Sequence, residues 1–169
     1  MAQRQRGVTH TAVHPFLFSS SKTFHLSDEC LPLSFTNHTM AVKDFKTRIK
    51  IKADAEDVYA AFTNPFTIEL WSGYPAVMPE VAGEEFSMWE GDIAGKILEI
   101  EPGQRIVQEW YFGEQEEQSV VTIKFFPKGG TVQVDLFHTN IPEEAYDEIC
   151  EGWVKYYLGA IKEFLEIDD

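Results

Sequence analysis

Apolar and polar residues alternate over residues 45–52, and this alternation predicts a half-buried β-strand. The inward positions of the pattern are Phe45, Thr47, Ile49 and Ile51, and the residues between them are Lys46, Arg48, Lys50 and Lys52. Since successive side chains of a strand point to opposite faces, we expect one face of this strand to contact a core and the other to contact solvent.

Two short helices are expected directly after this strand. Asp54 has the residue type of a helix N-cap, and apolar side chains follow it at helical spacing up to Phe62. The dipeptide Asn64-Pro65 ends the first helix. The second helix is predicted over residues 66–70 and stops near Trp71-Ser72-Gly73.

Strand-like runs make up the middle of the chain, separated by short segments rich in Gly, Pro and acidic residues. The runs cover residues 85–89, 93–100, 105–112, 120–126 and 131–139. Runs of this length with short connections predict an antiparallel meander. Together with the first strand they predict a curved antiparallel sheet of about six strands.

The last predicted element is a helix of more than 20 residues that begins at Pro142, because proline is favoured at the first helical position. Apolar residues recur along it at intervals of three and four, which is typical of a helix with one buried face. They are Tyr146, Ile149, Cys150, Trp153, Tyr157, Ala160, Ile161 and Phe164. The order of elements predicts an α+β fold in which this long helix crosses the concave face of the sheet.

The first 39 residues differ in composition from the rest. They hold four of the five histidines and a serine run, and they show no sustained apolar period. The histidine spacing matches no compact metal-ligand pattern, and Phe16-Leu17-Phe18 is too short for a signal peptide; a transit peptide is a less favoured interpretation. We expect residues 1–41 to be a disordered leader, or an upstream extension of a domain that starts at Met40, and residues 42–169 to form one domain.

The chain is strongly acidic, and this charge bears on its partners. Its formal net charge is −14. Such a surface repels phosphates and anionic lipid, so we expect no nucleic-acid partner, and no apolar run approaches the roughly 20 residues of a membrane span. Cys30 and Cys150 form no CxxC pair, which indicates a reducing, cytoplasmic location rather than a disulfide framework.

Several short motifs between residues 55 and 157 resemble those of a known family. They are Ala55–Phe62, Gly83–Phe86, Gly91–Gly95, Glu101-Pro102-Gly103, Ile106–Trp110, Asn140–Glu144 and Gly152–Tyr157. Their order is similar to that in the activator of the 90-kDa heat-shock chaperone ATPase, specifically its C-terminal domain and stand-alone bacterial relatives. The resemblance implies the helix-grip (START-like, SRPBCC) fold and a possible chaperone partner. Nothing in the sequence corresponds to the separate N-terminal domain that makes most of the eukaryotic co-chaperone's contact with the chaperone.

Large aromatic residues at inward-facing positions are the candidates for lining a ligand pocket. The full set is Trp71, Tyr74, Phe86, Trp110, Phe125, His138, Trp153 and Tyr157. The same residues would serve equally as ordinary core packing, because a core and a cavity in this fold share walls. If Gly95, Gly152 and Gly159 leave room, a cavity on the order of a few hundred Å³ remains, the usual size of a small-molecule site.

No catalytic site is predicted. His138 is in phase with the inward positions of its strand, where it would bond a ligand, carry a proton, or simply bond a backbone carbonyl. Glu109 alternates opposite Trp110, so we expect it on a solvated face. No Ser-His-Asp order, HExxH, phosphate loop or GxGxxG occurs, and we predict no enzymatic activity, no cofactor and no metal.

The sequence therefore favours a non-catalytic binding module with an apolar pocket for a small hydrophobic or amphipathic ligand. The alternative is a chaperone-associated interaction protein, which the family resemblance implies. An enzyme of the cyclase or hydrolase kind is a third hypothesis. We expect a monomer or a homodimer.

Overall fold

The structure is a computed structural model that describes residues 41–113, 115 and 117–167. The leader predicted for residues 1–41 thus lies, except for Ala41, outside the described residues. The helices and strands are β1 (Val42–Ile51), α1 (Ala55–Thr63), α2 (Pro65–Ser72), β2 (Glu85–Met88), β3 (Ile93–Glu101), β4 (Arg105–Trp110), β5 (Ser119–Pro127), β6 (Val132–Pro142), α3 (Tyr146–Glu151) and α4 (Leu158–Leu165).

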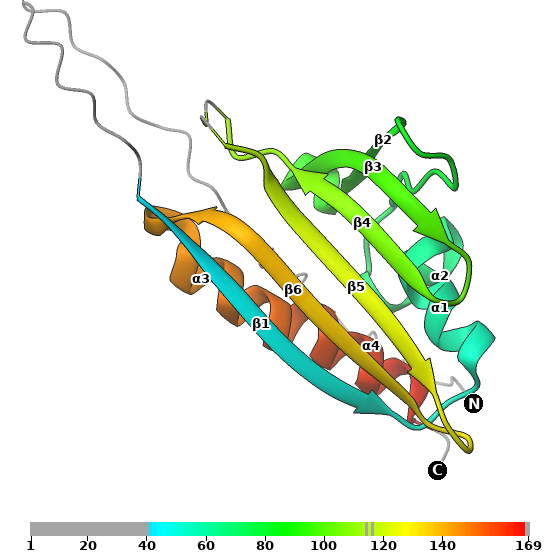
Figure 1. Ribbon diagram of the computed structural model, residues 1–169. Helices are drawn as coiled ribbons and strands as arrows, with labels where there is room; N and C mark the ends of the chain where they lie inside the picture. The colour runs from blue at the N-terminus through cyan, green and yellow to red at the C-terminus, as the bar shows by residue number, and fades with distance from the viewer. Residues whose placement is uncertain (1–40, 114, 116, 168–169) are drawn as a thin grey trace, which may run out of the picture.

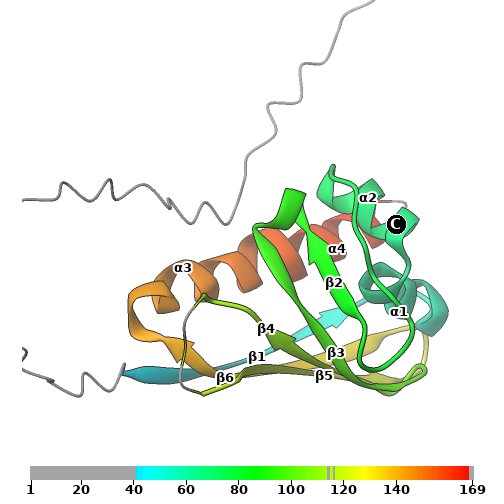
Figure 2. The same cartoon turned by 90° about the horizontal axis from the view of Figure 1, so that it is seen from above.

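The strands form one antiparallel sheet in the order β1-β6-β5-β4-β3-β2. Strands β2 to β6 pair in chain order, which confirms the predicted five-stranded meander, and β1 pairs with β6 to complete the predicted sheet of about six strands. Figures 1 and 2 show the sheet curved around the C-terminal helical segment, with α1 and α2 at one end of its concave face. The predicted α+β arrangement is confirmed.

The N-terminal elements form where the sequence pattern placed them. Burial alternates along β1 as predicted, and Asp54 occupies the N-cap position of α1, although its side chain makes no capping hydrogen bond. The second helix is longer than predicted: Asn64 Oδ1 accepts a hydrogen bond from the Thr67 amide at 3.1 Å, and Pro65 takes the first helical position. Gly73 ends this helix with a positive φ of 79°.

The prediction that Pro142 begins the last helix is wrong. Pro142 is the last residue of β6, with a ψ of 135°, and it pairs with Val42 of β1. The next amide, that of Glu143, donates a hydrogen bond to the carbonyl of Ala41 at 2.9 Å, so the sheet continues to this point. Proline is compatible with the last position of a strand, and the helical segment starts with a 3-10 turn at Glu143–Ala145.

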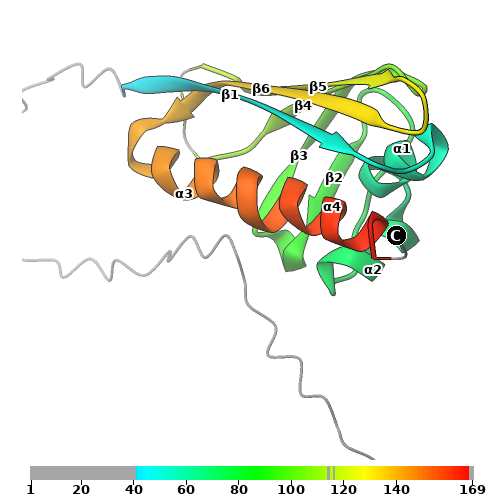
Figure 3. The ribbon, with the colours of Figure 1, turned by 90° about the horizontal axis from the view of Figure 1, so that it is seen from below.

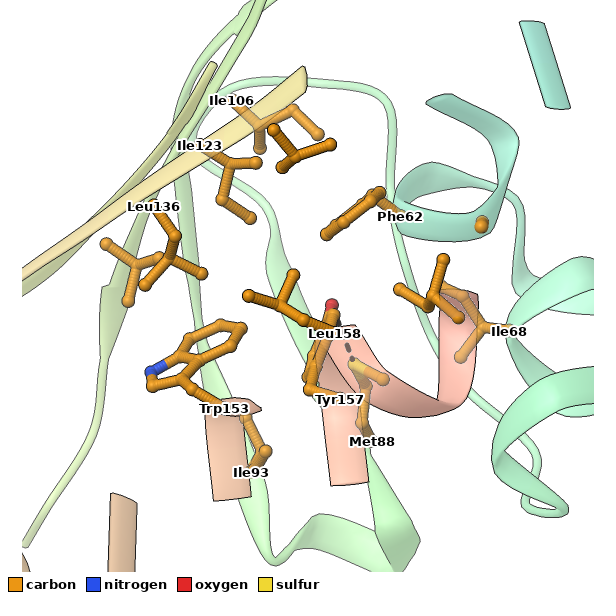
Figure 4. Packing of buried hydrophobic residues seen from close by; sticks show 14 of the residues in the cluster. Phe62, Ile68, Met88, Ile93, Ile106, Ile123, Leu136, Trp153, Tyr157 and Leu158 are labelled. Carbon is orange, nitrogen blue, oxygen red and sulfur yellow. Dashed lines mark hydrogen bonds between the residues drawn. The ribbon is translucent and has the colours of Figure 1, made fainter. Parts of the chain in front are cut away.

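The C-terminal helical segment is not uniformly α-helical. Between α3 and α4 lies a π-helical stretch, Gly152–Tyr157, which holds the buried Trp153 and Tyr157. The whole segment crosses the concave face of the sheet (Figure 3). The core lies between the two layers, and Figure 4 shows Trp153, Tyr157 and Leu158 of this segment packed near strand residues such as Ile123 and Leu136.

Candidate functional site

The residues predicted to line a pocket come together on the concave side of the sheet. Phe86 and Trp110 project from β2 and β4, Trp153 and Tyr157 project from the π-helical stretch, and all four are at most 2% exposed. Phe125, His138 and Trp71 are also buried, whereas Tyr74 is only partly buried. Whether any of them binds a ligand stays a prediction, but their assembly into one cluster is what the alternation predicted.

These aromatic rings contact one another. The ring of Trp153 lies 4.7 Å from that of Trp110 and 4.6 Å from that of Tyr157. The ring of Tyr157 in turn lies 5.0 Å from that of Trp71 and 5.8 Å from that of Phe62. Separations of this size are direct contacts between aromatic side chains. The rings therefore occupy much of the space between helix and sheet where a ligand was expected.

Two of the three glycines expected to leave room, Gly95 and Gly159, lie close to other atoms. A Cβ added to Gly95 would lie 1.9 Å from the carbonyl oxygen of Glu109 and 2.7 Å from the ring of Phe86. A Cβ added to Gly159 would lie 2.8 Å from the carbonyl oxygen of Val154, within the widened helical turn. Both glycines thus allow close packing of backbone or ring. They do not mark an opening.

The buried His138 belongs to a network of side chains. Its Nε2 lies 2.8 Å from Ser119 Oγ, and its Nδ1 accepts a hydrogen bond from the indole N–H of Trp153 at 3.0 Å. Ser119 Oγ also donates to the carbonyl of Thr139 at 3.1 Å. Burial lowers the pKa of His138 to about 3, so the imidazole is neutral at neutral pH. The inward orientation predicted for His138 is confirmed, but its partners are two side chains rather than a backbone carbonyl.

The proton positions in this network limit its chemistry. Trp153 offers only a donor, so Nδ1 of His138 must be the acceptor nitrogen and the ring proton must sit on Nε2. Nε2 then donates to Ser119 and has no lone pair with which to take the serine proton. A serine nucleophile needs such a base. The sequence analysis missed Ser119, although it is in phase with the inward positions of β5.

The polar atoms of two further aromatic candidates, Trp71 and Tyr157, are bonded within the protein. The indole N–H of Trp71 donates to the carbonyl of Ala61 at 2.9 Å, so this residue is a buried part of α2. The hydroxyl of Tyr157 lies 3.7 Å from the sulfur of Met88 (Figure 4), and burial raises its pKa. These groups stabilise the core and are not presented to a ligand.

The opposite side of the sheet, which we call the outer face, consists of the outward-pointing side chains of β1, β3, β4, β5 and β6. No helix among the described residues covers it (Figures 2 and 3). A hollow of about 590 Å³, the central hollow, has a lining that includes Lys46, Glu99, Val107, Thr122, Lys124 and Phe137. A second hollow of about 540 Å³, the turn hollow, is lined by Lys50, Phe126, Pro127, Lys128, Thr131 and Gln133. The sequence analysis predicted no site on this face.

Comparison with the profiles of protein families shows to which family the chain belongs. The profile of the family described as "Activator of Hsp90 ATPase homolog 1-like protein" matches residues 52–166. The chain belongs to this family. The resemblance found in the sequence motifs is therefore confirmed.

Individual members of the Hsp90-activator family show how far the similarity extends. The human activator of 90 kDa heat shock protein ATPase homolog 1 is 26% identical over 110 residues, which are 64% of this chain and 32% of that protein. The Dictyostelium discoideum homolog is 28% identical over 123 residues, 71% of this chain and 32% of that protein. The chain therefore matches about a third of the length of these curated relatives.

Solved structures of the family agree with the fold. An HSP90 activator from Plasmodium falciparum superposes with a TM-score of 0.67 at 27% identity, over 72% of this chain and 95% of that one. The Aha1 dimer from Colwellia psychrerythraea gives a TM-score of 0.65 at 20% identity, over 74% of this chain and 97% of that one. The helix-grip prediction is confirmed.

One of the motifs on which the resemblance was based, Asn140–Glu144, has a structural role here. Asn140 adopts a positive φ of 55°, and its side-chain amide donates to the carbonyl of Gln118 at 2.9 Å. Its backbone amide donates to Asp44 Oδ1 at 3.1 Å, beside the irregularity in the pairing of β1 with β6. The motif thus shapes the end of the sheet.

Neither a membrane-spanning helix nor a metal-binding cluster occurs among the described residues. None of their helices has the length and apolar character of a membrane span. Across the same residues, no group of three or more His, Cys, Asp or Glu side chains is arranged to hold a metal ion.

Proposed function

We propose that this protein is a non-catalytic interaction domain that binds a 90-kDa heat-shock chaperone and stimulates its ATPase. The observation that carries the proposal is the family match over residues 52–166. Relatives that share this segment are named activators of that ATPase. Because the chain matches about a third of those relatives, we propose binding as its primary property and stimulation as the consequence.

The packing of the interior supports a role for the surface over a role for a pocket. Trp110, Trp153 and Tyr157 contact one another where a ligand was expected, and Phe86 fills the space beside Gly95. A small-molecule site needs an unfilled volume with convergent polar groups, and the polar atoms of His138, Trp153 and Tyr157 have partners within the protein. We therefore favour the chaperone-associated hypothesis over the ligand-binding one.

The Ser119–His138 pair supports the non-catalytic part of the proposal. The indole of Trp153 fixes His138 in the tautomer that donates to Ser119, so the pair is a satisfied polar contact in the core. We expect Ser119 to remain unlabelled by a fluorophosphonate probe on the folded protein. Stoichiometric labelling that stops in Ser119→Ala would instead support a hydrolase.

Calorimetric titration against the full-length chaperone from the same organism tests the proposal, together with its rate of ATP hydrolysis. We expect saturable binding and a higher rate, neither of which an unrelated acidic protein of similar size should produce. Absence of binding would overturn the proposal. A parallel titration with a small apolar dye tests the pocket: saturable dye binding that Ala160→Phe abolishes without unfolding would restore the ligand hypothesis.

A further inference from the structure

The positive charges of this acidic protein are concentrated on the sheet. Among the described residues, only Lys155 and Lys162 lie on the C-terminal helical segment, and every other Lys or Arg lies on a strand or directly after one. Most charged side chains of the helical segment are carboxylates, and the first of them are those of Glu143 and Glu144. The two sides of the domain therefore differ in charge, although the whole chain has a formal charge of −14.

The strand register arranges the outer face in rows. Lys46, Phe137, Thr122, Val107 and Glu99 are successive partners across β1, β6, β5, β4 and β3, and they form one row at the central hollow. Lys50, Gln133 and Phe126 form a parallel row at the turn hollow. Between the two rows runs a third that starts with Arg48, Asp135 and Lys124.

An ion pair holds the β1 end of the middle row, whereas, among the described residues, Lys124 of that row and Lys46 and Lys50 of the other two rows are not paired. Arg48 binds both carboxylate oxygens of Asp135, at 2.7 and 2.6 Å. Within the described part of the chain, Lys46, Lys50 and Lys124 make no ion pair. Each hollow therefore has a lysine available for an anionic partner.

Each hollow also presents an exposed aromatic side chain. Phe137 is 41% exposed and Phe126 is 47% exposed. Phe137 lies on β6, and Phe126 of β5 is the register partner of Gln133 on β6. Residues 133 and 137 are four residues apart, so the two rows are about 13 Å apart along the strand. An extended chain covers the same distance between residues i and i+4.

We propose that the outer face binds an extended acidic segment of the chaperone, with two apolar side chains four residues apart that enter the central and turn hollows. This inference rests on the proposed function and adds the surface and the chemistry of the partner. Lysines beside the hollows attract carboxylates, and the exposed rings of Phe126 and Phe137 contact the apolar side chains.

The surroundings of the hollows favour such a segment over a nucleic acid. The carboxylates of Glu99 and Asp135 line the central hollow beside its lysines, and a continuous phosphate backbone would be repelled by them. The net charge of the chain opposes a long polyanion in the same way. The central hollow is lined by the cations Lys46, Arg105 and Lys124 and by only two carboxylates, so its local charge favours a short segment that places its own carboxylates beside Lys46 and Lys124.

The surface is tested directly by NMR titration of the isotope-labelled protein with the acetylated, amidated peptide Glu-Phe-Glu-Glu-Glu-Phe-Glu. We expect salt-sensitive shifts at the amides of residues 122–126 and 133–137, reduced when both Phe are replaced by Ala and lost when every Glu is replaced by Lys. Absence of shifts, shifts elsewhere, or equal binding of the Lys peptide would overturn the inference. Stronger binding of single-stranded RNA at the same amides would overturn it in favour of a nucleic acid.

The second test uses the chaperone itself. We expect the double variant Lys46→Glu/Lys124→Glu to weaken chaperone binding about tenfold or more, whereas Lys155→Glu on the helical side should leave it unchanged. Circular dichroism confirms that both variants fold. Equal binding by the double variant would overturn the inference but leave the proposed function intact. If the unmodified protein does not bind the chaperone, the proposed function fails, and the peptide titration still decides the chemistry of the surface.

Discussion

The two faces of the sheet use the same strands in opposite ways. On the concave side, Leu136 and His138 of β6 are at most 1% exposed, and His138 is bonded on both ring nitrogens. On the outer face, the neighbouring residue Phe137 is 41% exposed, and Lys46, its register partner on β1, has no ion pair among the described residues. One face has its polar groups satisfied, and the other has groups available for contact.

This difference is the basis of the proposed binding surface. A side chain that already contacts several rings must give up those contacts to admit a ligand, and this costs free energy. An exposed phenylalanine beside an unpaired lysine gains contacts when a complementary partner arrives. The strand alternation places the stabilising contacts on the concave side, and we propose that recognition uses the outer face. The following predictions test that assignment.

The largest expected effect is the loss of Trp153 from the interior. Its side chain is fully buried, contacts Trp110 and Tyr157, and donates to His138. We expect Trp153→Ala to lower the free energy of unfolding by about 3–5 kcal/mol, the usual cost of removing a large buried aromatic. Urea denaturation measures this quantity. An unchanged midpoint would show that the interior does not depend on this ring.

Acidification should destabilise the interior through His138. Its pKa is about 3 in the folded protein against an ordinary value of 6.5, so the unfolded chain takes up a proton as the pH falls below 6.5 while the folded protein does not. The stability present above that pH is therefore lost progressively toward pH 3, and we expect a loss of about 2 kcal/mol between pH 7 and pH 5.

The matched control for the pH effect is His138→Gln. A glutamine amide can accept from Trp153 and donate to Ser119 without titrating. The difference between the two proteins isolates His138, since the four histidines before residue 41 are present in both. If the unfolding free energies of the two proteins changed in parallel between pH 5 and pH 7, the pH effect would not come from His138.

The fold was predictable because its signals are local. Alternation marked β1, and the turns bounded each strand of the meander. The end of β6 was not predictable in this way, because proline suits both a first helical turn and a last strand position. Only the pairing of Pro142 with Val42 decides between them. The π-helical stretch left no signal either, since its spacing of apolar residues is close to that of an α-helix.

The site was less predictable than the fold. Alternation correctly turned Trp110 and His138 inward, but it could not show whether inward rings leave a cavity or fill it, because that depends on distances between elements. Ser119 was missed because its partner is 19 residues away on the next strand. The hollows were missed because they depend on rows across three strands in one case and five in the other, and no stretch of sequence displays such a row.

A smaller effect is expected from removing the hydroxyl of Ser119. Ser119→Ala leaves the Nε2–H of His138 buried without its acceptor and the carbonyl of Thr139 without this donor. We expect a loss of about 1–3 kcal/mol of unfolding free energy, the cost of an unsatisfied buried polar group. The same substitution in the Trp153→Ala background should cost less, because that variant already disturbs the network. Strict additivity in a double-mutant cycle would show that the three side chains are not coupled.

The smallest effect on stability should come from the outer face, and adjacent residues provide the comparison. Phe137→Ala removes a partly exposed ring that contacts neighbours on one side of the sheet only, so we expect a loss of less than about 1 kcal/mol. Leu136→Ala, one residue earlier, should cost about 2–5 kcal/mol because that side chain is buried in the core. Chaperone binding should reverse the order: Phe137→Ala should weaken it, while Leu136→Ala, measured where it remains folded, should not. If Phe137→Ala destabilises the protein as much as Leu136→Ala, the outer face is part of the structural core and recognition must lie elsewhere.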